Sequence, residues 1–149
     1  MKLLRLGDKG KEKPAVIDND GNYRDLSSII DELNPDSLNF ETIEKINNIK
    51  LSELTKLNKD NRIGSCISKP SKFIGIGLNF SDHAAETGAK PPKEPIIFMK
   101  ATSSINGPND NIEMILGSKK LDWEVELGIV IGKETKHINK NESQKHILG

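Results

Sequence analysis

The chain has 149 residues, enough for one domain or for one small domain and part of another, and its 34% hydrophobic content is low for a self-sufficient core. Lysine plus arginine and aspartate plus glutamate both number 22, so there is neither the basic excess that binds nucleic acid nor an acidic tail. No segment is long and apolar enough for a signal peptide or a membrane span, and we expect a cytoplasmic protein without membrane or nucleic-acid partners.

The N-terminal segment predicts a β-hairpin. Residues Lys2–Leu6 have the composition of a strand, and Ala15–Asp18 are the expected partner strand. The following turn, Asn19–Asn22, contains Asp20-Gly21, a pair that favours tight hairpin turns because glycine adopts positive φ without strain.

Two helices are predicted after this turn. The first has Asp25 as its N-cap and ends before Asn34-Pro35. Its apolar stripe consists of Leu26, Ile29, Ile30 and Leu33. The second helix spans Glu41–Asn47, with Ile43 and Ile46 facing inward. We therefore expect residues 1–69 to form a small α/β domain without catalytic residues.

A domain boundary is predicted at Pro70, and residues 70–149 form the second domain. Cys66, the only cysteine, excludes an internal disulfide, and its surroundings favour a buried thiol over a nucleophile. Residues 72–79 predict a buried strand that contains Gly75 and Gly77. This glycine pair is not a dinucleotide-binding motif, because Phe80 occupies the position of the third glycine.

A short helix is expected over Asn79–Gly88, with Asn79 or Ser81 as the N-cap. His83 and Glu86 are three residues apart, which places them on one helix face. There the carboxylate can hold and polarise the imidazole so that it acts as a general base. The alternative interpretation is an ordinary surface pair.

The remaining sequence predicts mostly β-structure. Strands are expected at Glu94–Lys100 and Ile112–Leu116, with a turn at Ser104–Asp110 between them and a short helix after Asn141. These strands have no obvious closing partners within the chain.

Residues 121–132 alternate between apolar and other residues, which predicts a strand. Glu124 and Glu126 project from the same face, roughly 6 to 7 Å apart from the rise per residue. That face continues with Gly128 and Gly132, so we expect the glutamates to lie in a pocket. Two such carboxylates can bind one hard cation, Mg²⁺, Mn²⁺ or Ca²⁺. The alternative is that both glutamates only decorate the solvated face of a strand.

Three segments together resemble the fumarylacetoacetate hydrolase family. They are Phe73–Glu86, which reads FIGIGLNFxxHxxE; Pro95–Lys100, which reads PIIFMK; and Gly117–Leu127, which reads GSxxxDWEVEL. The resemblance is to prokaryotic members described as ureidoglycolate lyases or as hydrolases of 2,4-diketo-3-deoxy sugar acids. It implies an α+β protein in which a small N-terminal α/β unit precedes the first part of a mixed β-roll catalytic domain with short helical inserts.

The resemblance also implies an enzyme that binds Mg²⁺ or Mn²⁺ and forms a homodimer when complete. By position, Glu124 and Glu126 would be metal ligands, His83 and Glu86 a dyad that activates water, and Lys100 a substrate-binding residue. In such an enzyme the metal chelates a small oxo acid, water attacks the distal carbonyl, and the C–C bond of a 2,4-dioxo acid (an acylpyruvate) breaks.

The same groups would serve a ureidoglycolate lyase, an oxo-acid decarboxylase or a dienoate isomerase, and the sequence does not separate these reactions. Members of the family are nearly twice as long as this chain, and their third metal carboxylate, the aspartate of an Asn-Asp pair, follows the segment that ends here at Gly149. We therefore interpret the chain as the N-terminal part of such an enzyme. The alternative is an inactive fragment or a subunit that needs a companion chain.

Overall fold

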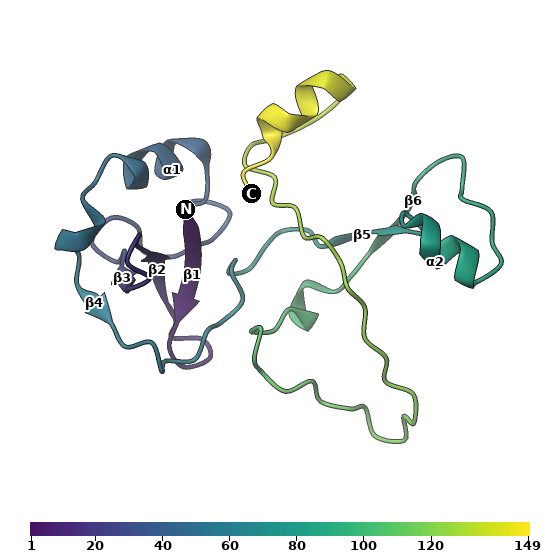
Figure 1. The fold of residues 1–149 in the computed structure, drawn as a ribbon, viewed down its shortest axis with the longest axis horizontal. Coiled ribbons are helices and arrows are strands. Elements are labelled where there is room, and N and C mark those ends of the chain that lie inside the picture. Colours follow the sequence, from purple (N-terminus) through teal and green to yellow (C-terminus); the bar gives the residue numbers. More distant parts are fainter. The chain divides into compact units, whose positions relative to one another are not determined.

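The computed structural model describes residues 1–149, which form two compact units (Figure 1). The first unit contains Met1–Ser68 and Asn106–Gly149, and the second contains Lys69–Ile105. The domain boundary expected between residues 69 and 70 stays a prediction.

A four-stranded antiparallel sheet forms the centre of the first unit, in the order β1-β2-β3-β4 (Figure 1). Its strands are β1 (Lys2–Leu6), β2 (Lys13–Ile17), β3 (Tyr23–Asp25) and β4 (Lys56–Leu57). The predicted strand Lys2–Leu6 is confirmed, whereas its partner begins and ends earlier than the predicted Ala15–Asp18. The short strands β3 and β4 were not predicted, because two or three residues carry no readable alternation.

The turn between β2 and β3 is the predicted one. Gly21 has a φ of 75°, and the Asn22 amide donates a 2.8 Å hydrogen bond to Asp18 Oδ1. Burial alone would raise the pKa of Asp18, but hydrogen bonds from Arg24 and Asn22 outweigh it and lower this pKa to about 2. The local turn chemistry of the sequence therefore fixes this hairpin.

The helix predicted from Asp25 to Asn34 is wrong, since residues 27–29 form only a turn. The Leu26 amide donates to the Pro14 carbonyl at 2.9 Å, which keeps Leu26 beside the sheet. Asp25 accepts a 2.8 Å hydrogen bond from the Ser27 amide, so it caps one turn rather than a helix. Leu26 is therefore buried against Val16 and Ile46 without being helical, and Leu33 is buried as well. An apolar stripe alone cannot distinguish this arrangement from a helix.

The second predicted helix is confirmed as α1 (Phe40–Asn47). Asn39 caps the helix by accepting a 2.9 Å hydrogen bond from the Thr42 amide. Ile46 is the buried residue of this helix. A short 3₁₀ helix, η1 (Leu51–Glu53), follows before β4.

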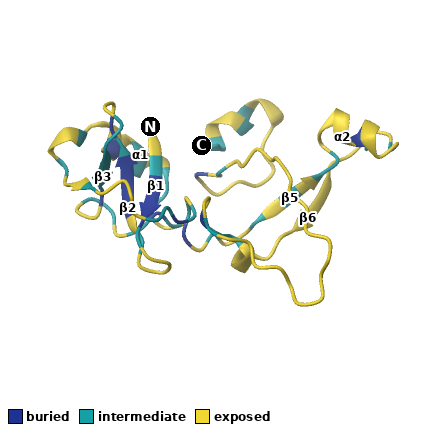
Figure 2. Cartoon of the chain, turned by 60° about the horizontal axis from the view of Figure 1, so that its bottom comes forward, coloured by how far each residue is buried: buried dark blue, intermediate teal, exposed yellow.

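The buried core lies in the first unit, around β1 and β2 (Figure 2). Successive residues of β2 face opposite sides of the sheet, so Ala15 packs with Leu4 and Leu6, whereas Val16 packs with a second cluster. That second cluster contains Leu26 and Ile46 and joins α1 to the sheet.

A ladder of charged side chains also connects distant parts of the first unit. Arg5 donates two hydrogen bonds to Glu32, at 2.7 and 2.8 Å, and a third to Glu12 at 3.1 Å. Arg62 donates to Glu12 at 2.8 Å and to both carboxylate oxygens of Asp110. Burial alone would raise the pKa of Glu12, but the hydrogen bond from Arg62 and the charge of Arg5 hold this pKa below its usual value. The ladder thus attaches the segment that begins at Asn106 to the N-terminal sheet.

Replacing Arg5 by methionine is expected to lower the free energy of unfolding by about 3 kcal/mol, because it removes one cationic partner of the buried Glu12 carboxylate and the ion-pair partner of Glu32, which keeps the hydrogen bond from the Leu33 amide. The matched control is Lys50→Met, whose pair with Glu53 is exposed and should contribute under about 0.5 kcal/mol. Urea unfolding followed by far-UV circular dichroism measures both. Equal effects of the two substitutions would contradict a stabilising role for the ladder.

The second unit is a β-hairpin with a short helix in its connection. Strands β5 (Ile74–Gly77) and β6 (Ile96–Met99) pair antiparallel, and α2 (Ser81–Glu86) lies between them in the chain. Both predicted strands are confirmed, but neither is buried: β5, predicted as a buried strand, alternates exposed and half-buried residues, and β6 is exposed along its whole length (Figure 2). The Phe98 ring lies directly over Gly75, where a Cβ would collide with it. A 3₁₀ helix, η2 (Thr102–Ser104), precedes the predicted turn, which forms at Pro108–Asp110.

The two strands predicted at Ile112–Leu116 and Leu121–Gly132 are not formed. Apart from a turn near Gly117, residues 111–130 are irregular and almost wholly exposed (Figure 2). A strand needs a neighbour that bonds its backbone, and the chain supplies one only at the end of this segment, where Ile131 forms an isolated bridge with Ile147. The predicted C-terminal helix is the 3₁₀ helix η3 (Lys140–His146). None of the helices has the length and apolar character needed to cross a lipid bilayer.

Candidate active-site residues

The predicted dyad of His83 and Glu86 lies on α2, in the second unit. Ala84 is the buried residue of this helix, and both His83 and Glu86 are exposed. No hydrogen bond or salt bridge joins their side chains, although their spacing places them on the same face. The dyad therefore stays a prediction, with its two members available to solvent and substrate.

The start of α2 differs from the prediction. Its N-cap is Phe80, which makes no side-chain capping bond, rather than Asn79 or Ser81. Leu78, between β5 and α2, has a φ of 49°, a left-handed conformation that costs a residue with a side chain roughly 1 kcal/mol or more. This conformation turns the chain from the strand into the helix that carries His83. Sequence reasoning did not single out Leu78, because leucine gives no signal for positive φ.

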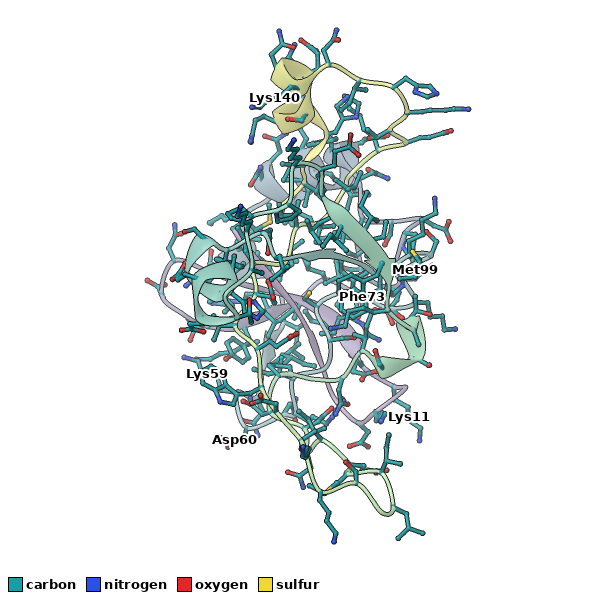
Figure 3. The ribbon with its side chains drawn as sticks, turned by 90° about the vertical axis from the view of Figure 1, so that its right-hand side faces the viewer. Lys11, Lys59, Asp60, Phe73, Met99 and Lys140 are labelled. Carbon is teal, nitrogen blue, oxygen red and sulfur yellow. The ribbon has the colours of Figure 1, made fainter.

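Lys100 follows β6 in the same unit. Its amide donates a 2.8 Å hydrogen bond to the Phe73 carbonyl, and its Nζ lies 5.7 Å from the centre of the Phe73 ring. Figure 3 labels Phe73 and Met99, which mark the end of the hairpin where Lys100 lies. The lysine side chain is exposed. Lys100 thus lies directly after the end of β6, and its substrate-binding role stays a prediction.

Glu124 and Glu126 lie in the first unit, on the exposed segment 111–130. Both carboxylates are exposed, so the predicted pocket around them is wrong for this structure. The reason is the missing partner for this segment, because a concave face forms only when neighbouring strands flank it. No group of three or more His, Cys, Asp or Glu side chains that could hold a metal ion is present. Two carboxylates nevertheless fit a hard divalent cation by donor type.

An apolar groove of about 420 Å³ occurs elsewhere in the first unit. It lies between α1, β1 and the C-terminal residues, and its lining includes Leu3, Ile43, Cys66, Val130 and Leu148. Cys66 is exposed rather than buried as expected. None of the five predicted site residues lines this groove. Its apolar lining, without a charged side chain, is not suited to an acidic substrate.

The comparisons with known proteins agree with one another. Residues 72–149 match the family described as fumarylacetoacetate hydrolase, C-terminal. Proteins from Burkholderia ambifaria and Burkholderia multivorans, each named only "Putative hydrolase", are 47% and 46% identical to the whole chain. The chain spans about half the length of these curated relatives, 53% of each.

A solved structure shares the fold. The fumarylacetoacetate hydrolase from the psychrophile Exiguobacterium antarcticum superimposes with a TM-score of 0.78 at 27% sequence identity. The alignment covers 99% of this chain and 52% of that protein. The expected α+β class is thereby confirmed, as a small mixed fold with two short sheets.

Proposed function

The chain belongs to the fumarylacetoacetate hydrolase family, and from that premise we propose that it supplies catalytic residues of a metal-dependent, cytoplasmic hydrolase that cleaves a C–C bond in a 2,4-dioxo acid. The observation that carries this proposal is the extent of the family match, residues 72–149. It includes all five predicted site residues, namely His83, Glu86, Lys100, Glu124 and Glu126.

Glu124 and Glu126 are the proposed metal ligands. Their all-oxygen donors and two negative charges suit Mg²⁺ or Mn²⁺ better than a softer cation. When bound, such a cation supplies Lewis-acid stabilisation of negative charge on the oxygens of the substrate. Because both side chains are exposed here, they are free to orient toward a cation without displacing any partner.

His83 is the proposed general base, and Glu86 is its proposed partner. A neutral imidazole can take a proton from water, and a carboxylate one helical turn away stabilises the imidazolium that results. The exposed Lys100 ammonium can pair with the carboxylate of a small oxo acid. We further propose that the complete protein is a homodimer, as the family resemblance implies.

The test joins residues 1–149 to the part of the Burkholderia ambifaria relative that lies outside the match, as one fusion protein. With Mn²⁺ present, this fusion protein is expected to hydrolyse an acylpyruvate. The reaction is monitored through the loss of the absorbance of the enol form of the substrate. Ureidoglycolate and oxaloacetate, assayed in parallel, measure selectivity. A folded fusion protein that turns over only ureidoglycolate or only oxaloacetate would contradict the proposed substrate class. So would a folded fusion protein that turns over none of the three compounds.

A further inference from the structure

The ammonium of Lys100 lies beside an aromatic ring rather than an acid. Its Nζ is 5.7 Å from the centre of the ring of Phe73, a half-buried residue. Lys100 forms none of the salt bridges of the structure. The lysines whose ammonium groups donate hydrogen bonds to other side chains are Lys50 and Lys145. All three N–H donors of the Lys100 ammonium are therefore available to a bound anion.

The β-ladder places Phe73 opposite Lys100. Ile74 pairs with Met99 in the register of β5 and β6, so the next pair outward is Phe73 and Lys100. The 2.8 Å hydrogen bond from the Lys100 amide to the Phe73 carbonyl extends the ladder to this pair. Residues directly opposite in an antiparallel ladder project to the same face, with their Cβ atoms about 4.5 to 5.5 Å apart. The contact between the ring and the ammonium therefore follows from the strand register.

A second aromatic residue lies on the same face of the hairpin. Phe98 precedes Lys100 by two residues and so projects to the same side. Its ring lies over Gly75 of β5, which has no side chain to prevent this. In the register of the hairpin, Phe73 and Phe98 are thus the nearest neighbours of Lys100 on this face. Neither position carries a carboxylate that would neutralise the ammonium.

We propose that Phe73 is a positioning residue for Lys100: its ring holds the ammonium at the end of the hairpin, where it receives the carboxylate of the small oxo acid. The inference rests on the proposed function, which gives Lys100 its substrate. A lysine held in a salt bridge would have to leave its partner in order to bind an anion. An aromatic ring attracts the ammonium through its face and occupies none of its N–H donors. The ring thereby restricts the flexible lysine stem before the substrate binds, which lowers the entropy cost of binding.

The first measurement tests the contact itself in the 149-residue chain, without substrate or metal. In heteronuclear NMR with isotope-labelled lysine, the ε-methylene protons of Lys100 are expected upfield of those of lysines that contact no ring. Lys100→Arg assigns this signal by its loss. Phe73→Leu keeps an apolar side chain but removes the ring, so it should abolish the upfield shift. Phe73→Trp should keep the shift, because indole binds cations at least as well as phenyl.

The second measurement tests binding of the oxo acid to the fusion protein with Mg²⁺. Pyruvate is the probe, because it lacks the bond that the proposed reaction breaks. Phe73→Leu is expected to weaken pyruvate binding about 2- to 5-fold, the effect of one cation–π contact near the surface. Lys100→Met should weaken it about 10-fold or more, because it removes a charge-assisted bond to the carboxylate. Titration of the NMR signals with pyruvate measures each affinity.

A combined variant separates positioning from general stability. If Phe73 acts through Lys100, Phe73→Leu should cause no further loss of pyruvate affinity in the Lys100→Met background. Phe73→Trp should keep the affinity of the parent. The matched control is Phe40→Leu, because the Phe40 ring lies 5.8 Å from the Nζ of Lys133, a lysine without a proposed role. This control should leave pyruvate binding unchanged.

An upfield Lys100 signal that persists in Phe73→Leu would overturn the contact. A loss of affinity that is equally large in the Lys100→Met background would overturn the positioning role. A fusion protein that binds pyruvate through Phe73 and Lys100 but does not hydrolyse an acylpyruvate would contradict the proposed reaction alone. Hydrolysis of an acylpyruvate with a KM that Phe73→Leu leaves unchanged would contradict this inference alone.

Discussion

Replacing both Glu124 and Glu126 by glutamine in the fusion protein is expected to weaken Mn²⁺ binding about 100-fold or more. The substitution removes two negative charges and exchanges carboxylate oxygens for amide groups, which are weaker ligands for a hard cation. The size of the side chains hardly changes, and both residues are exposed in the structure, so folding should be unaffected. Isothermal titration calorimetry should show one Mn²⁺ site per chain in the parent.

The matched control is Glu113→Gln combined with Glu134→Gln. These two glutamates are also exposed and lie on either side of the pair in the sequence, so the control removes the same charge from the same region. This control should change the affinity for Mn²⁺ less than about threefold, because salt screens the attraction between the cation and distant exposed carboxylates. Parent-like affinity in the Glu124/Glu126 variant, or equal losses in both variants, would assign the metal to other residues.

Replacing His83 by alanine in the same fusion protein should lower kcat by roughly 10²- to 10⁴-fold, the range for loss of a positioned acid–base group. Affinity for Mn²⁺ should stay nearly constant, because the imidazole is not a proposed ligand. Glu86→Gln should also lower kcat, because it removes the carboxylate proposed to stabilise the imidazolium that forms during the reaction. Steady-state assays measure both effects.

His137→Ala is the control for His83, because His137 is also an exposed histidine but lies outside the dyad. Its kcat should equal that of the parent. If His83→Ala kept the parent kcat, the histidine would be an ordinary surface residue. If Glu86→Gln lowered kcat as much in the His83→Ala background as in the parent, Glu86 would not act through the imidazole.

Local signals in the sequence were sufficient for several elements of the fold. The strand Lys2–Leu6, the Asp20-Gly21 turn and the helix that Asn39 caps depend on residues close together in the chain, and the structure confirms all three. The family, too, followed from the sequence, because its motifs are short and their order is readable without coordinates.

Other features depend on which segments meet in space, and the sequence could not supply them. The apolar stripe from Leu26 to Leu33 predicted a helix. Instead, a hydrogen bond from the Leu26 amide to the Pro14 carbonyl holds the chain beside the sheet. Arg5 and Arg62 pair with Glu32 and Asp110 across 27 and 48 residues, separations that no periodicity reveals.

The segment with Glu124 and Glu126 shows most clearly which features can be read from the sequence and which depend on tertiary contacts. Its alternation indicates the two faces of a strand, and its two carboxylates identify a candidate site for a hard cation. Whether that strand forms is decided by a neighbouring backbone, and within this chain only the end at Ile131 has one. The identities and spacing of the candidate site residues were therefore readable from the sequence, whereas their burial and enclosure depend on tertiary contacts, because a strand acquires hydrogen bonds and a covered face only from its neighbours.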